Sequence, residues 1–150
     1  EEVDRMEGAY DYDAVVSVQW PFGFGLSYTK FAYSNLTADR TEFKNGDQLT
    51  FSVDLTNEGD RVGKEVVMLF SRDMVASMVP ENRRLRAFTK VELQPGETRR
   101  VSLTIKASDL AFVNPQGKWT LEKGDFRIQI GSQVTMVRCT DTYIWESPNK

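Results

Sequence analysis

The feature that most constrains this chain is an alternation of apolar and polar residues with a period of two. In QLTFSVDLTN every second side chain across residues 49–55 is apolar, and the side chains between them are polar. The same pattern recurs across residues 101–105 and 126–130. Successive side chains of a β-strand point to opposite faces of a sheet, so each segment predicts a strand with one buried face.

Turn sequences separate the predicted strands. Asn57, Gly59 and Asp60 follow the first alternating segment, and these residue types favour tight turns. In QPGE, Pro95 sets the backbone angle of a turn and Gly96 accepts a positive φ. We therefore expect one chain reversal at each of these two places.

The remaining segments complete an all-β pattern. Residues Val66–Phe70 are apolar at every position, which predicts a central strand covered on both faces. We expect Asp109 to cap a single helical turn, and the tail TMVRCTDTYIW to supply a further strand. About seven short strands at a spacing of roughly 8–12 residues predict an antiparallel β-sandwich of the fibronectin III or immunoglobulin type over residues 32–150.

Residues 1–31 lack the alternation, and we interpret them as a linker and interdomain docking segment. WPFGFGLSYTKF, which ends at Phe31, holds five aromatic residues, two glycines and a proline. It lacks the third glycine of a G-x-G-x-x-G phosphate loop. Burying one large apolar side chain contributes about 1.5–3 kcal/mol, so we expect this cluster to dock against another domain. The predicted docking residues are Trp20, Pro21, Phe22, Phe24, Leu26 and Tyr28.

Composition argues against several classes of function. The net charge of -3 disfavours a nucleic-acid or anionic-membrane partner, and no apolar run is long enough to span a bilayer. The chain has no histidine, so the commonest general base and metal ligand are missing. Cys139 is the only cysteine and is expected to be a small buried side chain. We predict no catalytic residue, no cofactor and no metal site.

Two weaker possibilities concern carbohydrate. A glycosidase needs two carboxylates about 5–9.5 Å apart in a cleft, and nothing in this sequence indicates such a cleft. Exposed aromatic rings can stack on sugars, which makes Trp119 and Trp145 candidate glycan contacts. The alternative for Trp119 is packing on the sandwich after the NPQGK turn, and Trp145 lies in the tail.

Several segments, taken in order, resemble the C-terminal part of glycoside hydrolase family 3 enzymes, the β-glucosidase and β-xylosidase group. The resemblance extends from about Trp20 to Ser132. The segments that carry it are PFGFGLSYTKFAYSNL, TNEGDRVGKEVVMLF, SRDMVASMVP, LRAFTKVELQPGETRRVSLTI and DLAFVNPQGKWTLEKGDFRIQIGS.

The resemblance implies a fibronectin III-like accessory domain without catalytic residues, because the family's nucleophile and acid/base lie in domains upstream of Glu1. It implies that the partners are the catalytic domains of the same parent chain, with a homodimer as a further expectation. Oligosaccharide substrate would be met only through the parent enzyme, in the periplasm or after secretion. The alternative is a carbohydrate-binding or cell-surface adhesion module.

Overall fold

The computed structural model describes residues 29–74 and 83–146, and these residues form strands and one short helical turn. Seven strands are long: β1 (Phe31–Ala38), β3 (Gln48–Asn57), β4 (Gly63–Asp73), β5 (Arg84–Leu93), β6 (Thr98–Lys106), β9 (Gly124–Ile130) and β10 (Gln133–Cys139). Four are short: β2 (Glu42–Phe43), β7 (Phe112–Val113), β8 (Trp119–Leu121) and β11 (Tyr143–Trp145). The 3-10 helix η1 spans Ala107–Leu110.

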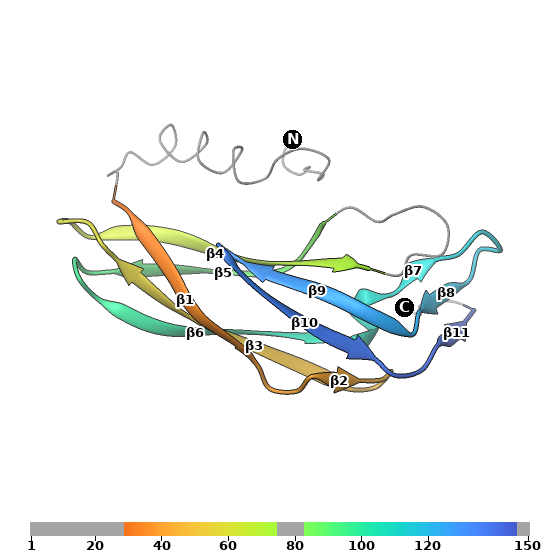
Figure 1. Cartoon of the computed structure of the whole chain (residues 1–150). Helices are drawn as coiled ribbons and strands as arrows, with labels where there is room; N and C mark the ends of the chain where they lie inside the picture. Colours follow the sequence, from red (N-terminus) through yellow and green to blue (C-terminus); the bar gives the residue numbers. More distant parts are fainter. Residues whose placement is uncertain (1–28, 75–82, 147–150) are drawn as a thin grey trace.

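The long strands form two sheets that face each other. One has the order β1-β3-β6, and the other has the order β2-β10-β9-β4-β5. Figure 1 shows these two layers lying along the same long axis, with the small sheet β11-β8-β7 at one end. All pairings are antiparallel within the described ranges except β2 with β10, which is parallel. The predicted all-β sandwich is confirmed.

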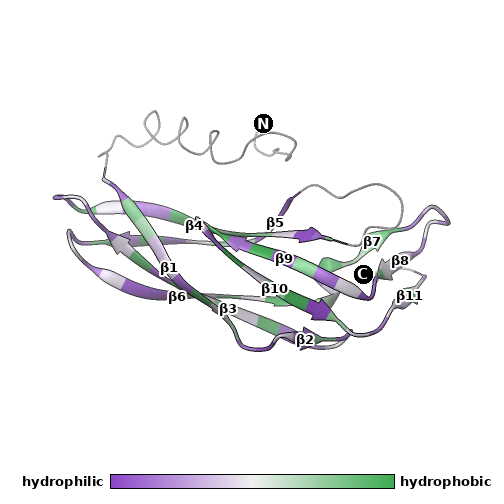
Figure 2. Ribbon diagram, in the orientation of Figure 1, coloured by the Kyte–Doolittle hydropathy of each residue, from purple (hydrophilic) through white to green (hydrophobic). Residues whose placement is uncertain are grey.

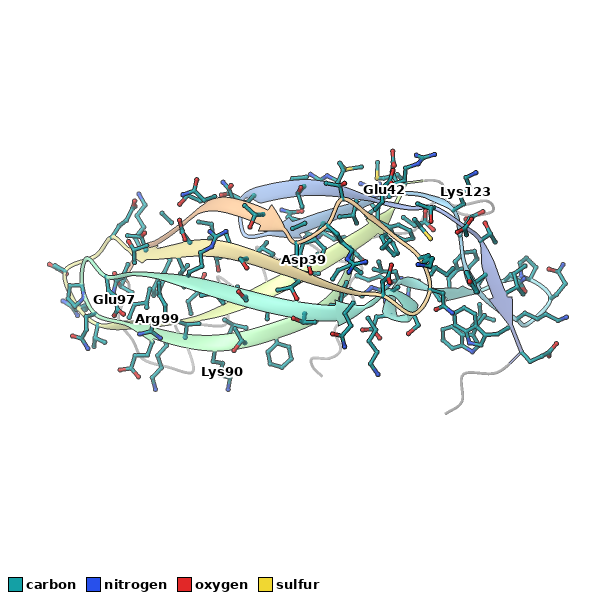
Figure 3. The ribbon with its side chains drawn as sticks, turned by 90° about the horizontal axis from the view of Figure 1, so that it is seen from below. Asp39, Glu42, Lys90, Glu97, Arg99 and Lys123 are labelled. Atoms are coloured by element: carbon teal, nitrogen blue, oxygen red, sulfur yellow. The ribbon has the colours of Figure 1, made fainter. Side chains whose placement is uncertain are left out.

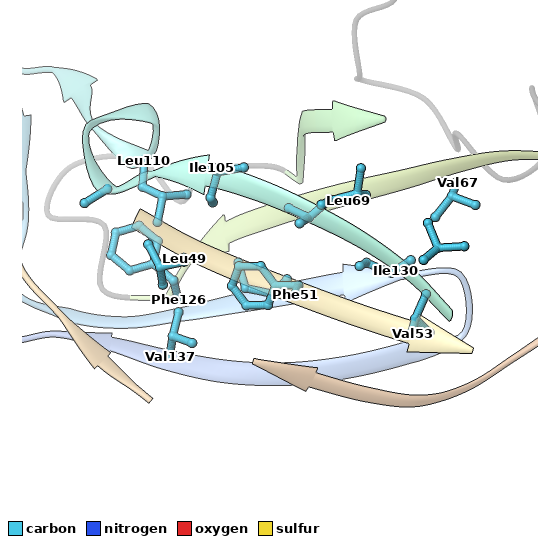
Figure 4. Packing of buried hydrophobic residues seen from close by; sticks show 14 of the residues in the cluster. Leu49, Phe51, Val53, Val67, Leu69, Ile105, Leu110, Phe126, Ile130 and Val137 are labelled. Carbon is cyan, nitrogen blue, oxygen red and sulfur yellow. The ribbon is translucent and has the colours of Figure 1, made fainter. Parts of the chain in front are cut away.

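The core lies between the two sheets and follows the alternation in the sequence. Leu49, Phe51, Val53 and Leu55 of β3 are fully buried, and the side chains between them are half-buried. Figure 4 shows Phe51 and Val53 facing residues of the opposite sheet such as Ile130. Along the ribbons in Figure 2, apolar and polar residues alternate on the long strands. The period-two pattern therefore identified the buried face correctly.

The two predicted turns connect the sheets to each other. The turn after β3 leads from the three-stranded sheet to β4, and its Asn57 Oδ1 accepts a hydrogen bond from the Gly59 backbone N–H at 2.8 Å. The QPGE turn leads from β5 back to β6, with Gly96 at φ 77°. Figure 3 shows Glu97 and Arg99 at this end of the sandwich, where they form an ion pair at 2.9 Å. Both turn predictions are confirmed, and neither turn closes a hairpin within one sheet.

Two local expectations need correction. Asp109 lies inside η1, and its carboxylate accepts a hydrogen bond from the Lys106 backbone N–H at 2.9 Å. It therefore supports the start of the helical turn from within, while Lys106 occupies the cap position. The tail supplies two strands, β10 and β11, where one was expected, because residues 140–142 interrupt the pairing.

The strand predicted to be covered on both faces is covered on one. β4 lies between β5 and β9, so its interior position in the sheet is as expected. Val67 and Leu69 point into the core and are fully buried, whereas Val66 and Met68 on the other face are half-buried. No third layer covers that face within the part of the chain that the structure describes.

The described chain begins just before the predicted start of the sandwich. β1 starts at Phe31, and Thr29 already contacts the domain through its hydroxyl. The predicted docking residues from Trp20 to Tyr28 lie outside the described residues.

Candidate functional sites on the sandwich

The structure places the two candidate glycan-contact residues side by side. Trp119 on β8 and Trp145 on β11 are direct cross-strand partners, although 26 positions separate them in the sequence. Both are half-buried and pack against the core. Tyr143 lies two residues before Trp145 on the same strand and is exposed. These three aromatic side chains form what we call the aromatic end of the domain.

Two acidic side chains, Asp54 and Asp47, have structural roles. The Asn35 amide and the Arg100 guanidinium both bond to the carboxylate of Asp54, and these contacts lower its pKa. The Lys44 backbone N–H at 3.0 Å lowers the pKa of Asp47 in the same way. No group of three residues that could hold a metal ion occurs among the described residues. Asp54 therefore stabilises a strand pair, and Asp47 stabilises a turn.

One carboxylate is half-buried on the inner side of the sandwich. Glu65 of β4 accepts a hydrogen bond from the Tyr33 hydroxyl of β1 at 2.6 Å, which joins the two sheets. Burial raises the pKa of Glu65, and the bond from Tyr33 lowers it in part. The alternation did not reveal this residue, because a single glutamate before an apolar run resembles the end of a strand.

Cys139 is fully buried, as the sequence predicts. Its thiol donates a hydrogen bond to the Asp141 carbonyl oxygen at 3.2 Å. Burial raises the pKa of the thiol. A protonated, buried thiol is a poor nucleophile, so Cys139 contributes packing.

The outer face of the three-stranded sheet is polar. Hydroxyl pairs join β3 to β6 across this face, with Thr50 to Thr104 at 2.8 Å and Ser52 to Ser102 at 2.8 Å. Next to the Ser52–Ser102 pair, Arg100 forms an ion pair with Asp54 at 3.0 Å. Cross-strand pairs of this kind stabilise a sheet whose surface faces water.

The outer face of the five-stranded sheet is different in character. Here Met68 of β4 lies opposite Phe88 of β5, and the Phe88 side chain is 59% exposed. Phe70, two residues further along β4, is only 4% exposed although it is outside the core cluster, and the Arg83 guanidinium lies 4.6 Å from its ring centroid. Further exposed apolar side chains on the same face are Leu85, Val134 and Met136.

Basic residues follow the apolar ones along this face. Arg72 of β4 lies directly opposite Arg127 of β9. The Arg127 guanidinium donates to the Gln129 side-chain oxygen at 3.3 Å, and Arg83 donates to the same oxygen at 3.4 Å. We call the side chains of β4, β5, β9 and β10 that point away from the core the outer face.

A buried asparagine holds the start of the described chain. Asn57 is fully buried, and its amide donates to the carbonyl oxygens of Arg61 at 2.9 Å and Leu93 at 3.1 Å. Its side-chain oxygen accepts a bond from the Thr29 hydroxyl at 2.6 Å. The sequence marked Asn57 only as a turn residue. Its second role depends on contacts with Thr29 and Leu93, each more than 25 positions away, which a local sequence pattern does not show.

Comparison with known proteins relates these features to a family. Residues 65–134 match the family model of the fibronectin type III-like domain. The lysosomal β-glucosidase of Dictyostelium discoideum is 36% identical over 134 residues, which cover 83% of this chain and 16% of the relative. The chain carries the fibronectin type III-like domain of glycoside hydrolase family 3.

Further relatives agree with this assignment. The periplasmic β-glucosidase of Salmonella typhimurium is 36% identical, with 85% of this chain and 17% of the relative covered. A solved β-glucosidase structure from Erythrobacter marinus has a TM-score of 0.71 and 36% identity over 79% of this chain and 16% of that one. The chain thus spans about one sixth of the length of these relatives. The resemblance stated from the sequence motifs is confirmed.

No helix in the described part of the chain is long and apolar enough to cross a membrane.

Proposed function

We propose that this fibronectin type III-like domain is the C-terminal accessory domain of a family 3 glycoside hydrolase and takes no direct part in catalysis. The supporting observation is the pattern of coverage: β-glucosidases match about four fifths of the chain, while the chain matches about one sixth of them. Glu97, Asp54 and Asp47 serve ion pairs and turns, which agrees with a role outside the chemistry.

On this proposal the parent enzyme hydrolyses β-glucosidic or β-xylosidic bonds. Relatives named β-glucosidase and β-xylosidase both match the chain. Two carboxylates in other domains of the parent would perform a double displacement that retains the anomeric configuration. The periplasmic relative favours an extracytoplasmic location, in the periplasm or outside the cell.

The role of the domain would be mechanical support. The docking residues from Trp20 to Tyr28 would lie at the junction with the catalytic domains and exclude water from it. Burying several aromatic side chains at such a junction would contribute several kcal/mol, at about 1.5–3 kcal/mol for each fully buried side chain. Support of a homodimer is a second expectation of the same proposal.

The test uses the complete reading frame that contains the Glu1 codon. We expect it to encode a barrel with a nucleophilic aspartate, and the purified product to hydrolyse an aryl β-glucoside or β-xyloside. Replacing Trp20 and Phe24 by serine in that enzyme should lower its melting temperature and its half-life of activity. The matched control is Val113→Ser, which changes an exposed side chain on β7.

Either of two results would contradict the proposal. One is hydrolysis by the 150-residue chain alone at a rate comparable with that of the complete product. The other is a complete product with no catalytic barrel.

The aromatic end supports a second candidate function, a carbohydrate-binding module. The observation that favours it is the direct pairing of Trp119 and Trp145. Stacking on a sugar would require their ring faces to be open, whereas both rings also pack on the core. Isothermal titration of the chain with cellulose, xylan and mixed-linkage glucan oligosaccharides tests it. Affinity that Trp145→Ala removes and Ile144→Ala retains would support this candidate, since Ile144 is an exposed neighbour of the pair on β11.

A further inference from the structure

The first two described residues are held by the turn between β3 and β4. The Thr29 hydroxyl donates a hydrogen bond to the Asn57 side-chain oxygen at 2.6 Å. The Lys30 carbonyl oxygen accepts a hydrogen bond from the Glu58 backbone N–H at 2.7 Å. Phe31, the next residue, pairs with Asn57 at the start of β1. The described chain is therefore attached to this turn before its first strand begins.

Two glycines beside the same turn make room for Thr29. A Cβ added to Gly63 would collide with the Thr29 methyl group, and a Cβ added to Gly59 would collide with the Thr29 hydroxyl oxygen. Neither glycine lies in the left-handed region of backbone conformation, so a positive φ is not the reason for glycine at either position. What the structure requires at both positions is space for the side chain of residue 29.

Asn57 links the seat of Thr29 to a second turn. Its side-chain amide donates to the carbonyl oxygen of Leu93, the last residue of β5, at 3.1 Å. Its backbone N–H donates to the Glu97 carbonyl oxygen at 2.9 Å, and its backbone carbonyl oxygen accepts a hydrogen bond from the Gly96 N–H at 2.8 Å. Figure 3 shows Glu97 at this end of the sandwich. The residue that holds Thr29 therefore also holds the turn between β5 and β6.

Detaching Thr29 would disturb a buried polar centre. Asn57 is fully buried, and its side-chain oxygen accepts hydrogen bonds from the Thr29 hydroxyl and from the Gly59 backbone N–H. Loss of Thr29 removes one of these bonds, and a buried polar group that loses a partner costs free energy. Figure 1 shows that β1 begins at the end of the sandwich where β4 begins. The contacts of Thr29 thus tie the entering chain to the two turns at this end.

We propose that residues 57–63 form an entry clamp, which seats Thr29 and fixes the place where the upstream chain joins the sandwich. The clamp fits a side chain with one hydroxyl and one methyl group: the hydroxyl bonds to Asn57, and the methyl group fills the space beside Gly63. The joint is therefore rigid at residues 29–31, and the peptide bond after Lys30 is protected from proteases. The inference concerns this chain alone and does not depend on the proposed enzymatic parent.

Trypsin cleavage after Lys30 tests the clamp in the full 150-residue chain, because cleavage of a folded segment follows the population of its open form. Thr29→Val removes the hydroxyl and should speed this cleavage roughly 2- to 12-fold, the factor for the loss of one hydrogen bond. Thr29→Ser keeps the hydroxyl and should retain most of the protection. Mass spectrometry of the fragment 31–150 measures the rate. Cleavage after Lys123, an exposed residue between β8 and β9, is the control and should keep its rate.

A rescue experiment tests the space beside Gly63 separately. Gly63→Ala should lower the melting temperature and speed cleavage after Lys30, because the added methyl group collides with that of Thr29. Thr29→Ser removes the methyl group that lies nearest to Gly63, so combining it with Gly63→Ala should recover most of the loss. The matched control is Gly117→Ala, whose added Cβ has no atom within 4 Å and whose effect should simply add to that of Thr29→Ser.

Three results would overturn the proposal. In the first, trypsin cleaves after Lys30 in the unmodified chain as fast as in a synthetic peptide of residues 20–40. In the second, Thr29→Val leaves the rate of this cleavage unchanged. In the third, Gly63→Ala causes the same loss whether threonine or serine occupies position 29. A failure of the parent enzyme to hydrolyse glycosides would leave all three measurements unaffected.

Discussion

Replacing Gly131 by alanine should destabilise the domain far more than replacing Gly117, a turn glycine whose added Cβ meets no other atom. Gly131 lies in the turn between β9 and β10 at φ 60°, a backbone conformation that costs a residue with a Cβ about 1–2 kcal/mol. A Cβ at this position would also collide with the ring of Tyr33, at Cγ and both Cδ atoms. The ring would have to move, although its hydroxyl bonds to Glu65 at 2.6 Å.

The expected loss follows from these two contributions. A hydrogen bond to a charged group contributes about 1.5–3 kcal/mol, so displacement of Tyr33 brings the total to roughly 2.5–5 kcal/mol. For a domain of this size, 1 kcal/mol shifts the melting temperature by about 2–4 °C, which gives a decrease of roughly 5–20 °C. Urea unfolding and thermal melting followed by circular dichroism would measure both quantities.

Two further variants separate the collision from the backbone cost. Gly117→Ala is the matched control, because Gly117 has φ 81° and no atom within 4 Å of the added Cβ, and it should cost about 1–2 kcal/mol. In a Tyr33→Ala background, Gly131→Ala should also cost only this amount. Equal losses for Gly131→Ala and Gly117→Ala in the unmodified domain would refute the reasoning.

Three other changes test the interior. Because burial raises the pKa of Glu65, the folded domain binds its proton more tightly than the unfolded chain, so stability is full below the ordinary glutamate pKa and falls as the pH rises through the raised value. Glu65→Gln should flatten the dependence of the unfolding free energy on pH, measured by urea titrations between about pH 4 and pH 8. If the variant shows the same pH dependence as the unmodified domain, another group causes it. Phe126→Ala opens a cavity in the middle of the core and should cost about 3–5 kcal/mol in the same assay, whereas Phe88→Ala on the outer face should cost far less. Asn57→Ala leaves the carbonyl oxygens of Arg61 and Leu93 without their donor and should cost about 2–4 kcal/mol, and a loss below 1 kcal/mol would show that water replaces the amide.

Strands and turns were predictable because they depend on neighbours in the sequence. The alternation in residues 49–55 places four apolar side chains on one face whatever the rest of the chain does. Gly96 needed only the local geometry of its turn, which the structure confirms. Asp109 shows the limit of such rules, since an acidic residue near a helical start fits either the cap position or the first turn.

The candidate sites were less predictable, because each depends on distant pairing. The sequence identified Trp119 and Trp145 by residue type, but only the pairing of β8 with β11 shows that they are neighbours. Glu65 and Tyr33 belong to different sheets, so their contact follows from how the sheets face each other. The docking role of Trp20 to Tyr28 stays a prediction.

The sequence by itself determined that this chain forms strands, which residues share a face and, through its motifs, which family it belongs to. The tertiary structure decided which face of β4 points into the core and which points outward. Val66 to Phe70 is apolar throughout, and periodicity assigns alternate residues to two faces without saying what covers each one. Packing of the two sheets buries Val67 and Leu69 and leaves the side of Met68 outward, because a sandwich of two layers has only one interior.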